Sequence, residues 1–128
     1  ICIAGATVGK LHRDWTRESQ LMMNEELLSL GLIKKSDIKK QTEDNLACRK
    51  YFMHGLGHVL GLDVHDVGLM SEPFAEGWVF TVEPGIYVPA EKIGVRLENN
   101  IVVTAGGPVD LTAGIPVEAE EIEELMRR

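Results

Sequence analysis

Two β-rich segments constrain the fold of this chain more than any other feature of its sequence. Residues 78–88 carry aromatic and β-branched side chains around a central Glu-Pro-Gly, and residues 94–104 are dominated by Val, Leu and Ile. Such side chains favour the extended backbone, so both segments predict strands, the first of them broken at Pro84-Gly85. The sequence AGGP at residues 105–108 predicts a turn directly after the second strand.

A helical pattern precedes the strands. Apolar residues recur at helical spacing between Val8 and Leu30, which predicts one long helix. Thr7 is a suitable N-cap for this helix and Gly31 a suitable residue for its end. Residues 34–45 are polar and charged, so we expect them to form a connection on the surface.

Two shorter helices complete the pattern. Ser36 is a candidate cap for a short helix inside the polar connection, and residues 118–126 combine Glu with Ile, Leu and Met as a final charged helix. The order of elements is therefore helix, strands, helix, and it predicts an α+β fold.

Composition excludes several classes of protein. Hydrophobic residues make up 45% of the chain, yet no apolar run approaches the roughly 20 residues of a membrane helix. A membrane is therefore not an expected partner, and the net charge of −7, which repels phosphate backbones, makes nucleic acid an unexpected partner as well. Cys2 and Cys48 match no metal-ligand or disulfide spacing, which favours reduced thiols packed in the core of a cytoplasmic protein.

Three of the four histidines fall within twelve residues, at His54, His58 and His65, and glycines lie between them. His54 and His58 are four residues apart, but the two intervening glycines argue against a regular helix. We expect a turn that directs separate imidazoles into one cavity. The cluster alone leaves two interpretations open, a metal or catalytic site and a purely structural role.

Two glutamates lie within the apolar strands, Glu83 in VFTVEPGIYV and Glu98 in GVRLENNIVV. Because side chains alternate along a strand, Thr81 and Glu83 should share one face, and so should Arg96 and Glu98. A carboxylate in apolar surroundings is costly unless it is paired or binds a metal. The structural alternative is a buried Arg96–Glu98 pair, or an edge strand that faces water.

Together, His58, Glu83 and Glu98 offer one nitrogen and several oxygen ligands. Such a set suits Mn²⁺, Co²⁺, Fe²⁺ or Zn²⁺. A divalent ion of this kind lowers the pKa of a bound water and polarises a carbonyl group. The reaction class that this combination predicts is metal-assisted hydrolysis of an acyl bond, in which the remaining histidines would hold the substrate or stabilise an oxyanion.

Three segments in this order resemble the pita-bread metallopeptidases, specifically aminopeptidase P and prolidase. They are HGLGHVLGLDVHDVG at 54–68, VFTVEPGIY at 79–87 and GVRLENNIVVT at 94–104. The resemblance implies the C-terminal portion of a pita-bread fold, an antiparallel curved sheet with flanking helices. It also implies hydrolysis of an N-terminal Xaa-Pro bond with two divalent metal ions, Mn²⁺ first and Co²⁺, Zn²⁺ or Fe²⁺ as alternatives.

The resemblance also implies roles for individual residues. His58 resembles the family's metal-ligating histidine, Glu83 a metal ligand that is also the general base, and Glu98 the glutamate that bridges the two metals. His65 resembles the histidine that contacts the substrate carbonyl and assists proton transfer. His54 and Arg96 resemble residues of the substrate pocket near the proline, and His54 joins the catalytic set.

One departure from the family pattern limits what this chain can do alone. The family uses five protein ligands, two of them aspartates upstream of the matching segments, and Asp14 in the predicted helix does not fit their place. With Ile1 in the first position, we therefore expect residues 1–128 to be a partial catalytic domain of a larger protein, inactive in isolation.

The sequence leaves alternatives open for the substrate, the class of function and the oligomeric state. The expected substrate is a peptide with proline at its second position, and the short stretch between Tyr87 and Gly94 favours aminopeptidase P over a prolidase-type Xaa-Pro dipeptidase. A metal-free pita-bread module for protein interaction is the alternative from a different class. Assembly of several copies as a homo-oligomer is compatible with the sequence.

Overall fold

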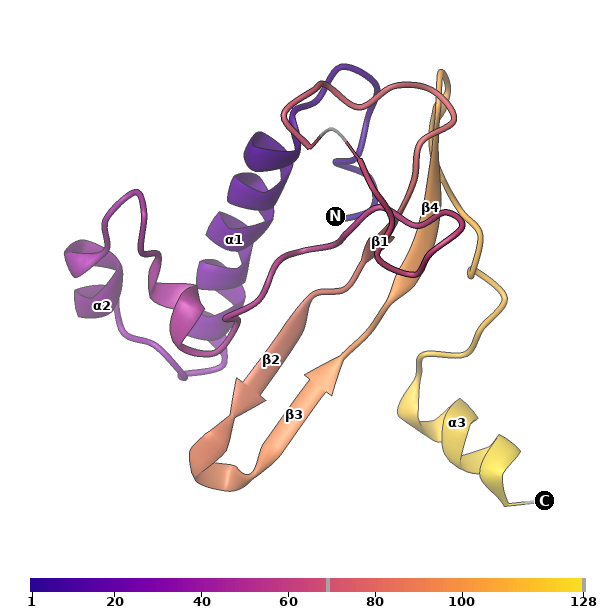
Figure 1. The fold of residues 1–128 in the computed structure, drawn as a ribbon. Coiled ribbons are helices and arrows are strands. Elements are labelled where there is room, and N and C mark those ends of the chain that lie inside the picture. Colours follow the sequence, from indigo (N-terminus) through magenta and orange to yellow (C-terminus); the bar gives the residue numbers. More distant parts are fainter. Residues whose placement is uncertain (69, 128) are drawn as a thin grey trace.

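The computed structural model describes residues 1–68 and 70–127, and it consists of helices beside an antiparallel β structure (Figure 1). The predicted α+β class is thereby confirmed. The elements in chain order are α1 (His12–Ser29), α2 (Lys35–Lys40), the 3₁₀ helix η1 (Ala47–Lys50), β1 (Val79–Val82), β2 (Gly85–Val88), the 3₁₀ helix η2 (Pro89–Glu91), β3 (Ile93–Arg96), β4 (Asn99–Thr104), β5 (Gly107–Asp110) and α3 (Ala119–Met126).

The strands form two sheets, and residues 79–88 and 93–104 each contribute one strand to either sheet. β1 pairs with β4 and β4 with β5, while β2 pairs only with β3, and every pairing is antiparallel. Pairing stops after Val82↔Asn99 and resumes at Gly85↔Arg96. Pro84 has no N–H for a ladder bond, so the predicted break at Pro84-Gly85 is the point where the structure changes from one sheet to the other.

The long helix ends as predicted but begins later. Gly31 follows the helix in the left-handed region, at φ +74°. The residue at the N-cap is Leu11 rather than Thr7, and it makes no side-chain cap. The Thr7 carbonyl instead accepts the Lys10 N–H at 3.1 Å in a turn, and Gly9 has φ +84°. A left-handed residue cannot belong to a right-handed helix, so the helix starts only after this turn.

The short helix also has a different cap. Ser36 lies inside α2, and the cap residue is Lys34, whose backbone N–H donates to the Asp37 carboxylate at 2.8 Å. The prediction of Ser36 as the cap was therefore wrong. A carboxylate three residues into the helix satisfies the free N–H at its start as well as a serine cap would, and adds a favourable interaction with the helix dipole.

Strand β5 was not predicted. Residues 105–108 were expected to form a turn, but only Ala105 and Gly106 do so, and Gly107 and Pro108 already pair with β4. Proline is tolerated there because β5 is the edge of its sheet and needs no N–H on its outer side. The final helix, α3, agrees with the expected residues 118–126 to within one residue, and Figure 1 shows it lying apart from the other elements.

The core lies between α1 and the three-stranded sheet. Trp15 of α1 contacts Phe80 of β1 edge to face, with ring centroids 5.2 Å apart, and Phe74 at 5.7 Å. Fully burying a side chain of this size stabilises a fold by about 1.5–3 kcal/mol. The buried residues of this cluster are Ala6, Trp15, Phe52, Leu56, Phe74, Phe80, Val82, Ile101 and Val103.

A second, smaller cluster joins α1 to the segment before the histidines. It consists of Leu27, Ile33, Leu46 and Cys48, and Cys48 is a free thiol with no exposed surface. Asn24 of α1 supports it by accepting the Cys48 N–H at 2.7 Å. None of the helices in the described part of the chain is both long and apolar enough to cross a membrane.

Candidate active site

The histidine segment runs beside β1 as an extended chain. The Leu60 N–H donates to the Val79 carbonyl, the Thr81 N–H to the His58 carbonyl, and the Glu83 N–H to the Leu56 carbonyl, at 2.8–3.1 Å. Residues 56–60 therefore lie antiparallel to β1 and extend its sheet by one irregular strand. The expectation of a non-helical backbone between His54 and His58 agrees with this arrangement.

Gly57 is required by the closeness of these two segments. A Cβ atom on Gly57 would lie 2.8 Å from the backbone carbonyl carbon of Thr81 and closer still to its oxygen. Real Cβ atoms do not approach backbone atoms so closely. Gly57 therefore allows the histidine segment to approach β1 until the side chains of His58 and Glu83 meet.

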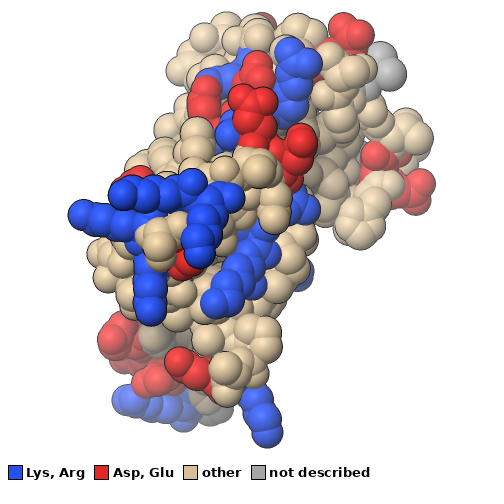
Figure 2. Space-filling model, turned by 90° about the vertical axis from the view of Figure 1, so that its left-hand side faces the viewer, with Lys and Arg blue, Asp and Glu red and all other residues tan. Residues whose placement is uncertain are grey.

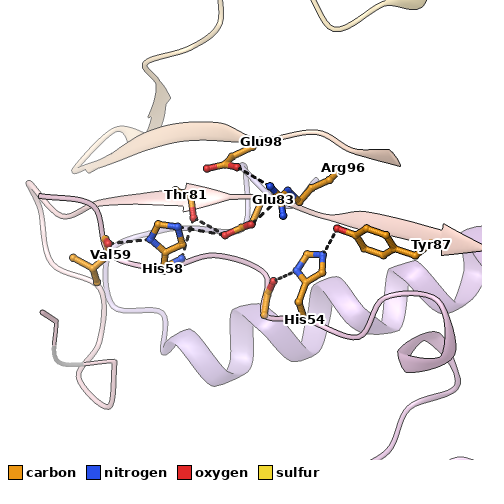
Figure 3. Close-up of polar contacts among 9 residues, drawn as sticks. His54, His58, Val59, Thr81, Glu83, Tyr87, Arg96 and Glu98 are labelled. Carbon is orange, nitrogen blue, oxygen red and sulfur yellow. Dashed lines mark hydrogen bonds and ion pairs between the residues drawn. The ribbon is translucent and has the colours of Figure 1, made fainter. Parts of the chain in front are cut away.

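The side chains of His58 and Glu83 face each other, and Glu83 lies where β1 has ended and β2 has not yet begun (Figure 3). His58 Nε2 lies 3.5 Å from Glu83 Oε1, and the Glu83 side chain is 14% exposed. The other ring nitrogen, His58 Nδ1, lies 3.1 Å from the Val59 carbonyl oxygen. Since a carbonyl can only accept, Nδ1 carries the proton in the neutral imidazole and Nε2 presents its lone pair toward Glu83.

Glu98 is linked to Glu83 through Arg96 (Figure 3). Arg96 Nε is 3.8 Å from Glu83 Oε2, and the second contact of the guanidinium joins Arg96 Nη2 to Glu98 Oε2 at 3.9 Å. The Arg96 and Glu98 side chains are 50% and 40% exposed, so they do not form the buried pair considered above. The structure thus brings Glu83 and His58 together, with Arg96 between Glu83 and Glu98 (Figure 3).

His54 has protein partners at both ring nitrogens. Nδ1 lies 2.7 Å from the Gly55 carbonyl oxygen and therefore donates to it, and Nε2 lies 3.0 Å from the Tyr87 hydroxyl. In the neutral imidazole the Tyr87 hydroxyl must donate to Nε2. A substrate that contacts His54 through Nε2 would therefore have to replace the Tyr87 hydroxyl. No role for Tyr87 was predicted from the sequence.

His65 completes the group of three histidines. Its ring lies against that of His58, with centroids 4.1 Å apart. The loop that carries His65 is held by Asp66, whose carboxylate accepts the N–H groups of Val67 and Leu62, each at 2.7 Å. These backbone donors, Val67 first, lower the pKa of the Asp66 carboxyl, so it stays ionised and holds the loop at neutral pH.

A hollow of about 320 Å³ connects these side chains. It is lined by His54, His58, His65, Glu83 and Arg96, together with Gly55 and Gly57. Five of the six residues expected to form the site therefore border one space, and Glu98 is the exception. A volume of this size lies at the lower end of the range for small-molecule and peptide pockets.

The donor set fits a divalent ion in part. His58 Nε2 and the Glu83 carboxylate converge, and the hydrogen bond from His58 Nδ1 to a backbone carbonyl is the arrangement that orients metal-binding histidines. Within residues 1–68 and 70–127, however, no three His, Cys, Asp or Glu side chains are placed to hold an ion together. The described residues therefore present two converging candidate ligands, while the third candidate, Glu98, does not line the hollow.

A larger hollow has a different set of lining residues, none of which lines the hollow at the histidines. It has a volume of about 480 Å³ and is lined by residues of α2 and η1, among them Lys40, Arg49 and Lys50. Figure 2 shows Lys and Arg side chains gathered on this side of the molecule. It contains no histidine and no glutamate, so we place the candidate active site at the smaller hollow, where titratable groups of different kinds converge.

The fourth histidine, His12, packs against the aromatic core and does not line the hollow. It contacts Trp15 and Phe74 edge to face, and its Nε2 is buried without a partner in the described part of the chain. Burial lowers the pKa of the His12 imidazole, although a hydrogen bond to the backbone of Gly57 opposes this effect. His12 therefore remains neutral at physiological pH and contacts the histidine segment through the backbone of Gly57.

Comparison with known proteins agrees with this geometry. The Xaa-Pro aminopeptidase of Escherichia coli is 42% identical over 87% of this chain, and Xaa-Pro aminopeptidase 1 of Streptomyces coelicolor is 37% identical over 97%. The chain spans only 27% and 28% of the length of these two relatives. It therefore corresponds to under a third of each.

Solved structures show the same fold. Zn-substituted E. coli aminopeptidase P in complex with product superposes with a TM-score of 0.77 at 38% identity, covering 98% of this chain and 31% of that one. Proline aminopeptidase P II from Yersinia pestis gives 0.76 at 36% identity with the same coverage. The predicted pita-bread fold is thereby confirmed. The model of metallopeptidase family M24 matches residues 2–105, and the chain belongs to this family.

Proposed function

We propose that this chain is the part of a metallopeptidase that supplies one side of its active site, for hydrolysis of the N-terminal Xaa-Pro bond of peptides. The observation that carries the proposal is the convergence of His58 Nε2 and the Glu83 carboxylate beside a hollow that His54, His65 and Arg96 also line. Membership of family M24 and relatives named Xaa-Pro aminopeptidase support the same activity.

In this proposal His58, Glu83 and Glu98 hold the metal. A bound divalent ion would lower the pKa of a water molecule and polarise the carbonyl of the scissile bond. Two ions, with Mn²⁺ as the native metal, agree with the family resemblance. The two further aspartate ligands would come from a longer polypeptide, since the chain spans under a third of its relatives, and residues 1–128 would then be a partial catalytic domain.

The side chains of the hollow would divide the chemistry among them. Glu83 takes the proton of the attacking water, since its carboxylate borders the hollow, contacts Arg96 and is little exposed. His65, whose ring lies against that of His58, donates a hydrogen bond to the developing oxyanion. His54 and Arg96 border the hollow on the side of β2 and β3 and would contact the proline part of the substrate.

The names of the relatives favour aminopeptidase P over a prolidase-type dipeptidase. All the relatives cited above are Xaa-Pro aminopeptidases, and the solved structures are aminopeptidases P. We accordingly propose peptides longer than two residues, with proline second, as the substrates. A cytoplasmic location, with both cysteines as free thiols, and assembly as a homo-oligomer belong to the same proposal.

The test compares the complete polypeptide that contains this chain with two variants. Glu83→Gln removes the proposed base and ligand, and Glu91→Gln is the matched control on the exposed helix η2. We expect Mn²⁺-dependent release of the first residue from Xaa-Pro-Xaa tripeptides, little cleavage of Xaa-Pro dipeptides, and a loss of kcat of about 10²-fold or more in Glu83→Gln alone.

Other results would contradict the proposal in different ways. Equal activity of the Glu83→Gln and Glu91→Gln enzymes would remove Glu83 from the chemistry. A complete polypeptide that retains no metal after dialysis and cleaves neither substrate would favour the metal-free interaction module. Preferential cleavage of the dipeptides would make the enzyme a prolidase-type dipeptidase.

A further inference from the structure

The side chain of Thr81 links the two converging ligands. Thr81 lies in the middle of β1 and is 1% exposed. Its hydroxyl oxygen lies 3.0 Å from the backbone nitrogen of His58 and 3.1 Å from Glu83 Oε1 (Figure 3). One buried side chain therefore contacts both the segment that carries His58 and the carboxylate of Glu83.

The direction of each hydrogen bond follows from the chemistry of the partners. A backbone N–H can only donate, so the Thr81 oxygen accepts from His58. The single hydroxyl proton is then free for Glu83, and an ionised carboxylate can only accept it. Both bonds are satisfied together only when Glu83 directs Oε1 toward Thr81, the same oxygen that lies 3.5 Å from His58 Nε2.

The bond to His58 replaces a backbone bond of the sheet. In an antiparallel pair, two opposite residues commonly exchange two backbone hydrogen bonds. Here the Thr81 N–H donates to the His58 carbonyl at 2.9 Å, but the return bond from the His58 N–H goes to the Thr81 hydroxyl. The sheet thus uses this side chain to place His58 relative to Glu83, although 25 residues separate the two ligands in sequence.

The two oxygens of Glu83 consequently have different surroundings. Oε1 faces Thr81 and His58, and Oε2 faces the guanidinium of Arg96 at 3.8 Å. From this geometry we infer that Thr81 is a positioning residue, which orients the Glu83 carboxylate and fixes the His58 backbone so that both side chains meet one divalent cation. The inference rests on the proposed metal site and assigns Thr81 no contact with the ion or the substrate.

Zinc affinity of the complete polypeptide that contains this chain tests the inference. Isothermal titration with ZnCl₂ compares wild type with Thr81→Val, which keeps the branched shape but removes the hydroxyl, and with Thr81→Ser, which keeps the hydroxyl. Thr104→Val is the matched control, because it deletes a strand hydroxyl that donates to the Gly107 carbonyl at 2.6 Å within a β-turn, away from the hollow. Urea unfolding of each variant separates affinity from stability.

We expect Thr81→Val to weaken zinc binding about tenfold to a hundredfold, the usual effect of removing a group that orients a metal ligand. Thr81→Ser should restore most of the affinity, and Thr104→Val should leave it unchanged even where it lowers stability. If Thr81→Val does not fold, Thr81→Ala takes its place, because it removes the hydroxyl without placing a methyl group against the His58 N–H.

Two outcomes would overturn the inference, and they are distinguishable. Wild-type affinity in a folded Thr81→Val or Thr81→Ala chain would show that Thr81 has only a structural role, while the proposed metal site would stand. A complete wild-type polypeptide that binds no zinc at millimolar concentration would refute the proposed metal site, and the role of Thr81 with it.

Discussion

Replacing Gly57 by alanine should test how closely the histidine segment must approach β1. The added Cβ would lie 2.8 Å from the Thr81 carbonyl carbon and closer still to its oxygen, and both are backbone atoms that cannot rotate away. The segment must therefore retreat from β1. Three hydrogen bonds of 2.8–3.0 Å depend on its present position: Thr81 N–H to the His58 carbonyl, His58 N–H to the Thr81 hydroxyl, and Glu83 N–H to the Leu56 carbonyl.

The expected loss of stability follows from these bonds. Each contributes about 1 kcal/mol net, so their loss destabilises the folded chain by about 3 kcal/mol. Alanine also restricts the unfolded chain, which offsets about 0.4–1 kcal/mol of this loss. We therefore expect a net decrease of about 2 kcal/mol in the free energy of unfolding, a large share of the 5–15 kcal/mol typical of a domain.

Gly55→Ala is the matched control for this experiment. Gly55 belongs to the same segment, but a Cβ there would meet no atom within 4 Å, and its φ is not in the left-handed region. Urea unfolding followed by tryptophan fluorescence should place Gly55→Ala at or slightly above the wild-type midpoint and Gly57→Ala well below it. Substitutions without effect scatter by about 0.5 kcal/mol. If the unfolding free energies of the two variants agree within that range, the close approach of Gly57 to Thr81 does not matter and the reasoning is refuted.

Three other predictions concern pH, the pocket and the isolated chain. Burial lowers the pKa of His12 from 6.5, so the unfolded chain binds a proton at this imidazole more readily than the folded chain does. The free energy of unfolding should therefore fall as the pH drops from about 6.5 toward the lowered pKa of the folded state. The urea midpoints of His12→Phe should lose that part of the pH dependence. Tyr87→Phe removes the donor to His54 Nε2, and the ¹⁵N resonance of that nitrogen should move downfield; an unchanged resonance would contradict the assigned bond. The 128-residue chain alone should not cleave Xaa-Pro peptides with added Mn²⁺, in a fluorogenic assay that detects the complete enzyme.

Sequence patterns predicted the regular elements well where one physical cause dominates. The break in the first β-rich segment, at Pro84, and the end of α1 at Gly31 follow from the missing N–H of proline and from the freedom of glycine, and both agree with the structure. The second segment was expected to be one strand over 94–104, but it is interrupted at Leu97 and Glu98, and its two parts, β3 and β4, belong to different sheets. The caps were less predictable, because several nearby groups can satisfy the first N–H groups of a helix. Asp37 did so in α2, and Thr7 was instead part of a turn.

The candidate site was predictable as a set of residues but not as an arrangement. Alternation along β1 placed Thr81 and Glu83 on one face, and the hydrogen bond between them agrees with this. Nothing in the pattern indicated that the Thr81 hydroxyl would also accept the His58 N–H, or that Tyr87 would bond to His54. Such contacts join segments far apart along the chain, and a single sequence contains no signal for the distance between them.

Sequence by itself determined which chemical groups this protein has available: imidazoles among glycines, and two carboxylates in apolar strands. It also determined the break at Pro84, since proline lacks the N–H that a sheet requires. Only the tertiary structure decided that His58 meets Glu83 while Arg96 contacts both Glu83 and Glu98. The physical reason is that these distances depend on the pairing of the 56–60 segment with β1 and on the change of sheet at residues 83–84, both of which arise from backbone hydrogen bonds between distant segments.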